Sequence, residues 1–241
     1  MNDEDKAFEA FRISTYLRKC MQEYIPVVTE RFKNNKGGRF PYFQRLLVTD
    51  DKANKWMCLF YELSKDDKKR RVFQTRAYTT YEVPRRHVEN DVNAGKGCII
   101  FDPFSMSKRF LEENSKTSFV MDIVPHAVNR YTERYLIPNG KGDLEWGKKI
   151  ENILSRWMYV DVCADLKGDL NAEKNKKDNL CPYDVLMRGG GMLRGQVVNE
   201  ILIRFTTYVS PDMMFDGQLE RQEEMIREYW RTVRYKNNII K

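Results

Sequence analysis

The chain has 241 residues, 41% of them hydrophobic and 12% aromatic, which excludes an intrinsically disordered protein and suits one large domain or two small ones. No apolar run approaches ~20 residues, and the acidic start at Asp3 to Asp5 is unlike a secretory signal, so we expect no membrane partner. The net charge of +7 favours phosphate-rich partners, and five cysteines without a CxxC pair indicate a reduced, cytoplasmic protein.

The first half of the chain predicts one helix followed by an antiparallel meander. Apolar residues recur at helical spacing over residues 3–25, and Pro26 is expected to end this helix. Three segments rich in β-branched and aromatic residues follow, separated by polar connections typical of hairpins. These predicted strands are residues 43–49, 55–63 and 71–83.

The second half mixes short strands with helices. A helix is expected from Pro125 to about Ile137, where Pro138-Asn139-Gly140 breaks the pattern. Residues 165–191 are rich in charge, asparagine and glycine, and are predicted to form a long loop or insertion. The other predicted elements are strands at 98–101, 118–124, 192–198 and 200–210, and helices at 144–158 and 216–233.

This order of elements predicts an α+β fold, an antiparallel sheet with helices packed on it and flanking helices at the N- and C-terminal ends. We divide the chain into an N-terminal part, residues 1–104, with the first helix and the meander, and a C-terminal α+β part, residues 105–241. One continuous domain with a shared sheet is the alternative.

The most informative segment is the helix that begins at Pro125. His126, Arg130 and Arg134 lie at positions i, i+4 and i+8, which on a regular α-helix places them within an arc of roughly 80°. The opposite side of this helix carries an apolar stripe that is expected to face the core. Its members are Ala127, Val128, Tyr131 and Tyr135.

An imidazole beside two guanidiniums suits phosphodiester chemistry. His126 titrates near neutral pH, and a place near the positive end of the helix dipole favours its neutral form, which a general base needs. Arg130 and Arg134 match phosphate oxygens in bidentate fashion, so the set suits metal-free attack by a ribose 2′-hydroxyl. The alternative is an ordinary solvated helix face, in which Glu133 pairs with Arg130 or another basic neighbour.

Two further regions are candidates for substrate binding. On strand 200–210, Arg204, Thr206 and Tyr208 alternate in line on the face opposite the predicted core face, where they would complete a phosphate site. An exposed sheet face without a ligand is the other interpretation. The chain has one other histidine, His87, which is the candidate partner of His126 in proton transfer or substrate contact.

Residues 126–134, His-Ala-Val-Asn-Arg-Tyr-Thr-Glu-Arg, resemble the HAxxRxxER signature of small bacterial and phage domains. Those domains are grouped with the RelE-like, barnase/EndoU/colicin-type ribonuclease fold. The resemblance implies helices packed on an antiparallel sheet, RNA cleavage without metal, and association with phages or mobile elements. It also implies catalytic roles for His126, Arg130 and Arg134.

The sequence therefore predicts a metal-independent, ribonuclease- or toxin-like protein, with His126 for proton transfer and Arg130 and Arg134 for phosphate. Two distant histidines without cysteine pairs match no usual zinc pattern, and GxSxG and GxGxxG are absent, so neither a metal nor a cofactor is expected. The alternatives are a non-enzymatic nucleic-acid-binding or phage accessory protein with the same basic face, or a structural protein. RNA or another nucleic acid is the expected partner, and a protein partner or self-association stays open.

Overall fold

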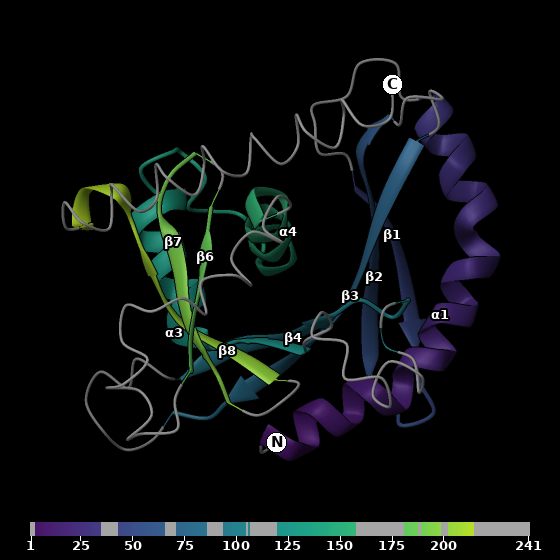
Figure 1. Ribbon diagram of the computed structural model, residues 1–241, viewed down its shortest axis with the longest axis horizontal. Helices are drawn as coiled ribbons and strands as arrows, with labels where there is room; N and C mark the ends of the chain where they lie inside the picture. The colour runs from purple at the N-terminus through teal and green to yellow at the C-terminus, as the bar shows by residue number, and fades with distance from the viewer. Residues whose placement is uncertain are drawn as a thin grey trace. The chain divides into compact units, whose positions relative to one another are not determined.

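The computed structural model describes residues 3–34, 43–65, 71–85, 94–104, 106, 120–157, 181–187, 189–198 and 202–214. They fall into two compact units, drawn in Figure 1: residues 1–125 with 198–204, and residues 126–197 with 205–241. The predicted helix 216–233 and His87 lie outside the described residues.

The first unit begins with a long helix, α1 (Asp3–Asn34), which continues through Pro26. The prediction that Pro26 ends this helix is wrong. An interior proline removes one backbone hydrogen bond and costs about 3 kcal/mol. Val28 and Phe32, beyond it, are both fully buried, and burying two such side chains contributes about 1.5–3 kcal/mol each, enough to offset the proline.

The strands of the first unit form the predicted meander. β1 (Phe43–Thr49), β2 (Lys55–Lys65), β3 (Arg71–Val83), β4 (Gly95–Phe101) and β5 (Val120–Ile123) pair antiparallel in succession. The strand order in this unit is β1-β2-β3-β4-β5-β8, where β8 (Leu202–Val209) contributes its first three residues. The predicted strands between residues 43 and 124 are thus confirmed, within two or three residues at each end.

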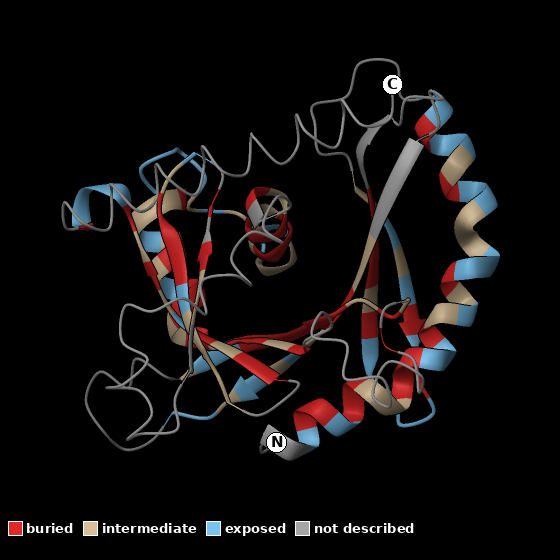
Figure 2. Ribbon diagram, viewed as in Figure 1, coloured by how far each residue is buried: buried red, intermediate tan, exposed pale blue. Residues whose placement is uncertain are grey.

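The core of the first unit lies between α1 and the sheet. The buried residues of α1 follow the side that faces the strands (Figure 2), as the helical spacing of apolar residues predicts. Trp56 on β2 and Phe101 on β4 meet edge to face, with ring centroids 5.6 Å apart. The α1 residues in this core are Ala10, Ile13, Leu17, Met21, Val28 and Phe32.

The second unit combines two helical segments with a three-stranded arrangement in the order β8-β7-β6. Its elements are α3 (Pro125–Tyr131), the π-helical turn η1 (Thr132–Leu136), α4 (Trp146–Trp157), β6 (Cys181–Leu186), β7 (Met192–Val197), the rest of β8 and the 3-10 turn η3 (Pro211–Met213). The helices predicted at 125–137 and 144–158 and the strands at 192–198 and 200–210 are confirmed.

The prediction of a loop over 165–191 is wrong for residues 181–186, which form β6. β6 pairs antiparallel with β7, with Cys181 opposite Val197 and Leu186 opposite Met192. Pairing with β7 decides this strand, because its own sequence, interrupted by Pro182 and Asp184, lacks a clear alternation.

Together these elements confirm the predicted α+β fold with antiparallel strands and a flanking N-terminal helix. None of the helices in the described part of the chain combines the length and the apolar character needed to cross a membrane.

Candidate functional site

The first part of the predicted catalytic helix is α3, and its apolar stripe faces the core as expected. Ala127 and Tyr131 are fully buried and Val128 is 3% exposed. His126, the second residue of α3, is half-buried, and Arg130 follows it by one regular α-helical turn. This part of the helix therefore brings His126 and Arg130 to the same side.

The regular helix ends before Arg134. From Thr132 to Leu136 the backbone forms the wider π-helical turn η1, in which the Ile137 N–H donates to the Thr132 carbonyl at 2.9 Å. The Thr132 hydroxyl in turn donates to the Val128 carbonyl at 2.8 Å. The spacing that aligns three side chains on an α-helix consequently holds only from His126 to Arg130.

Arg134 is directed to the sheet of the second unit. Its Nη1 donates to the backbone carbonyl of Tyr208 on β8 at 2.6 Å, and its side chain is half-buried. Arg134 thus links η1 to β8, a contact that the helical pattern did not predict.

Arg130 remains on the outer side of α3 and forms an ion pair. Its Nη1 lies 2.8 Å from Oε2 of Glu133, and the two side chains are 35% and 54% exposed. The pair that the sequence offered as an alternative is therefore present. Because both groups stay solvated, the pair contributes about 0–1 kcal/mol.

Tyr208 is fully buried, although the alternation of β8 placed it on a face opposite the core. In the second unit this face is covered: the Tyr208 ring lies 5.1 Å from that of Tyr131 and 6.4 Å from that of Tyr135. Burial raises the pKa of the Tyr208 phenol. Its hydroxyl donates to the Gly190 carbonyl at 3.4 Å, which is a structural contact.

These three tyrosines surround a buried guanidinium that the sequence patterns did not predict. Arg156 on α4 is 6% exposed, and its Cζ lies 3.5 Å from the centroid of the Tyr135 ring. Its Nη1 donates to the Tyr131 hydroxyl at 3.3 Å and its Nη2 to the Gly190 carbonyl at 2.5 Å. The available signal was the position of Arg156, three residues after Ile153 and thus beside the apolar face of α4.

In the first unit, Arg204 takes part in a different cluster. Its Nε donates to Oδ2 of Asp122 at 3.0 Å, and this carboxylate is fully buried. Asp122 also accepts hydrogen bonds from the Lys6 ammonium at 2.7 Å and from the Tyr81 hydroxyl at 2.5 Å. Asp122 was missed, although an acidic residue inside the apolar strand at 118–124 is a signal for a buried polar contact.

Tyr81 completes this cluster because the sheet leaves room for it. A Cβ on Gly97 of β4 would lie 2.5 Å from the Tyr81 ring, so only glycine accommodates the ring here. Burial raises the pKa of Tyr81, and the charge of Asp122 raises it further, so the phenol stays protonated and donates. The Lys6 ammonium lies 4.3 Å from the centroid of the same ring.

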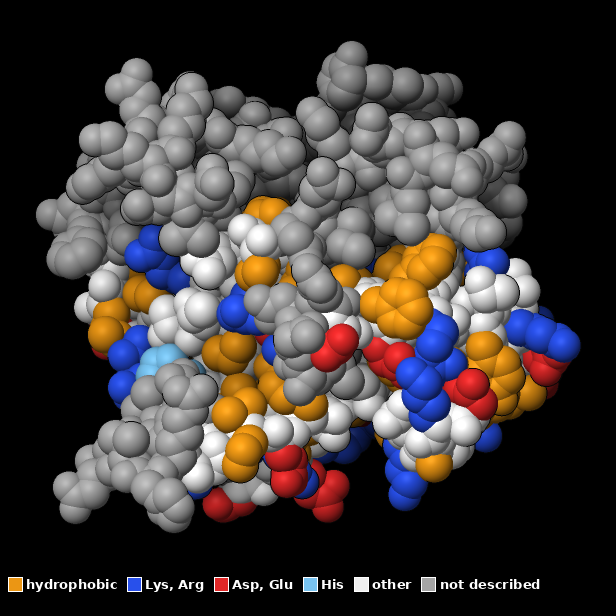
Figure 3. All heavy atoms as spheres, turned by 90° about the horizontal axis from the view of Figure 1, so that it is seen from below, with side chains coloured by type: hydrophobic (Ala, Val, Ile, Leu, Met, Phe, Trp, Pro, Cys, Tyr) orange, Lys and Arg blue, Asp and Glu red, His pale blue; other side chains and the backbone are white. Residues whose placement is uncertain are grey.

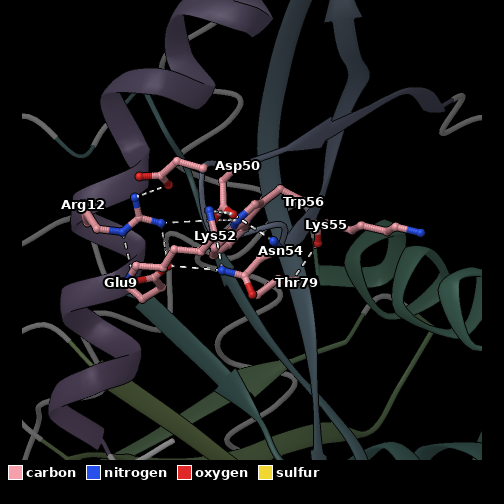
Figure 4. Close-up of polar contacts among 9 residues, drawn as sticks. Glu9, Arg12, Asp50, Lys52, Asn54, Lys55, Trp56 and Thr79 are labelled. Atoms are coloured by element: carbon pink, nitrogen blue, oxygen red, sulfur yellow. Dashed lines mark hydrogen bonds and ion pairs between the residues drawn. The ribbon is translucent and has the colours of Figure 1, made fainter.

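A second charged cluster joins α1 to the turn between β1 and β2 (Figure 4). Arg12 donates to both oxygens of Glu9, at 2.7 and 3.0 Å, and to Asp50 at 3.0 Å. The buried Asp50 also accepts from the Trp56 indole at 3.1 Å and from the Asn54 amide at 3.0 Å. Because Asp50 accepts all these hydrogen bonds, its role is to stabilise the turn.

The remaining candidate, Thr206, is exposed and donates to the Arg194 carbonyl at 3.4 Å.

On the face shown in Figure 3, basic side chains lie beside acidic and hydrophobic ones, so that face carries mixed charge. Within the described residues, no group of three or more His, Cys, Asp or Glu side chains is arranged to hold a metal ion.

The structure thus places His126 and Arg130 on the same helix, joins Arg134 to Tyr208, and places Arg204 with Asp122.

Comparison of the chain with protein-family models, with curated proteins and with solved structures finds no match in any of the three.

Proposed function

We propose that this chain binds RNA through phosphate contacts made by the α3 surface, which consists of His126 and Arg130. The observation that carries the proposal is their place on one turn of regular helix, where both side chains are partly exposed. A guanidinium offers a planar fork to two phosphate oxygens, and an imidazole one turn away adds a hydrogen bond. The net charge of +7 supports association with a polyanion.

Binding is favoured over catalysis because one predicted catalytic residue and one predicted substrate-binding residue have other contacts. Arg134 donates to a backbone carbonyl, and the Tyr208 hydroxyl lies in a buried cluster. A phosphate-binding surface needs only accessible donors, whereas cleavage also needs charge stabilisation and proton transfer aligned on one phosphodiester.

The test is the affinity for a fluorescent 20-nucleotide single-stranded RNA, measured by anisotropy at several salt concentrations. Wild-type protein is expected to bind with an affinity that falls steeply with salt. Arg130→Gln should weaken binding roughly 5- to 10-fold and lower the salt slope by about one. Lys33→Gln removes the same charge from the exposed end of α1 and should have a smaller effect; equal effects would contradict the α3 surface.

Metal-independent RNA cleavage is the second candidate, and the place of His126 in the first turn of α3 favours it. In that reaction His126 takes the proton of a ribose 2′-hydroxyl, which attacks the adjacent phosphate. The bond from phosphorus to the 5′-oxygen breaks, the 5′-oxygen takes a proton from water, and a 2′,3′-cyclic phosphate forms. Cleavage in EDTA by wild type and its loss in His126→Ala would support it, whereas intact RNA with wild type would contradict it.

We place this function in the cytoplasm. Cys20, Cys58 and Cys98 are free thiols, and thiols persist in a reducing compartment. Cell fractionation followed by immunoblotting tests this location, and recovery of the chain outside the cytoplasmic fraction would contradict it.

A further inference from the structure

We propose that Glu133 competes with phosphate for Arg130 and thereby limits the affinity of the α3 surface for RNA. This inference rests on the proposed function and names the residue that regulates it. The two groups are three residues apart, and the oxygen of one lies 2.8 Å from the nitrogen of the other. A carboxylate at that distance occupies part of the donor fork that a phosphate needs.

The exposure of the pair makes it displaceable. The Arg130 side chain is 35% exposed and that of Glu133 is 54% exposed, so water reaches both charges. An ion pair in this setting is weak and is screened further by salt. An RNA phosphate that approaches from solvent therefore exchanges with the Glu133 carboxylate, and the carboxylate returns when the RNA leaves.

The π-helical turn η1 increases the effect of this competition on RNA affinity, because it removes a second guanidinium from the α3 surface. Arg134, the second guanidinium of the predicted row, donates to the Tyr208 carbonyl, so Arg130 is the guanidinium that the turn leaves beside His126. Glu133 acts on that guanidinium directly. Two guanidiniums on one face would share the carboxylate, and its effect on each would be smaller.

The experiment is a double-mutant cycle with the same 20-nucleotide RNA at low salt. Glu133→Gln removes the charge and keeps the size of the side chain, and it should tighten binding about 3- to 5-fold. Glu145→Gln is the matched control, because Glu145 is exposed in the same unit and takes part in no ion pair among the described residues. Its effect should stay below about 1.5-fold.

The last protein of the cycle is the double variant, in which Glu133→Gln is combined with Arg130→Gln. If Glu133 acts by occupying Arg130, Glu133→Gln should change the affinity of the Arg130→Gln protein by less than about 1.5-fold. The same 3- to 5-fold gain in that background would overturn the inference, because Glu133 would then act by general repulsion. An effect equal to that of Glu145→Gln would overturn it too.

The outcomes separate this inference from the proposed function. If wild type binds with steep salt dependence and the cycle shows no coupling, only the inference is wrong. If wild type does not bind and Glu133→Gln does, Glu133 blocks the surface and the inference is supported. If neither binds, both are wrong.

Discussion

Arg134 donates a hydrogen bond from Nη1 to the backbone carbonyl oxygen of Tyr208, 2.6 Å away and 74 residues further along the chain. A charged donor at this distance is stronger than a neutral one, and its acceptor belongs to a fully buried residue. The side chain that the helical pattern assigns to phosphate binding therefore helps to hold η1 against β8.

We expect Arg134→Met to lower the free energy of unfolding by about 1.5–3 kcal/mol, because the Tyr208 carbonyl loses a charged donor. RNA affinity should change less than in Arg130→Gln. Urea titration followed by circular dichroism measures the first quantity, and anisotropy the second. Unchanged stability together with a large loss of RNA binding would show that Arg134 acts on the ligand.

Gly140, in the turn after η1, and Gly191, in the β6–β7 turn, form a matched pair of glycines. Gly140 (φ 66°) and Gly191 (φ 78°) both have a left-handed backbone, in which an alanine costs about 1–2 kcal/mol. A Cβ on Gly140 meets nothing within 4 Å, whereas one on Gly191 overlaps the Tyr208 hydroxyl and lies 2.8 Å from the Val209 carbonyl.

Gly191→Ala should therefore lower the free energy of unfolding by a further ~1–3 kcal/mol relative to Gly140→Ala. Both are measured by urea unfolding under the same conditions. Equal losses would show that the Tyr208 hydroxyl moves freely and that the tyrosine cluster around Arg156 is loosely packed.

Asp122 supports the first unit as a buried acceptor for Lys6, Tyr81 and Arg204. Asp122→Asn leaves the nearly buried Lys6 ammonium without its carboxylate, and we expect a loss of about 3–5 kcal/mol in the free energy of unfolding. Asp143→Asn, at an exposed residue, should change it by less than about 0.5 kcal/mol. Similar small losses in the two variants would contradict a buried ion pair.

The cluster around Arg12 predicts loss of stability in acid. The hydrogen bond from Arg12 lowers the pKa of Glu9 from its ordinary 4.5. Burial alone would raise the pKa of Asp50, but hydrogen bonds from Asn54, Trp56 and the backbone outweigh it, and the pKa lies below 3.8. Carboxyls with a lowered pKa contribute stability above the unfolded-state pKa, and this contribution is lost as pH falls through the folded value.

We therefore expect the stability of wild type to decline below about pH 5, as protonation of the unfolded chain begins to compete. Asp50→Asn should be less stable than wild type at pH 7, and the difference should shrink as pH falls below 3.8. Urea unfolding followed by tryptophan fluorescence between pH 7 and pH 3 measures both. A difference that stays constant with pH would show that folding does not lower the pKa of Asp50.

Local patterns predicted most of the fold. The helical spacing of apolar residues over residues 3–25 marks one side of the helix as apolar, and the structure buries that side of α1. Pro26 was misread because its local preference to end a helix is outweighed by the burial of Val28 and Phe32 beyond it. β6 was missed because its strand is defined by pairing with β7.

The sequence alone determined the class of fold, the apolar side of α3 and the grouping of His126 with Arg130, since each follows from repeats within a few residues. Only the tertiary structure decided that Tyr208 and Arg156 are buried, that Arg134 turns to β8 and that Asp122 gathers Lys6, Tyr81 and Arg204. The reason is distance along the chain: the contacts of Asp122 with Lys6 and of Arg134 with Tyr208 span 116 and 74 residues, and no local period encodes such a partner.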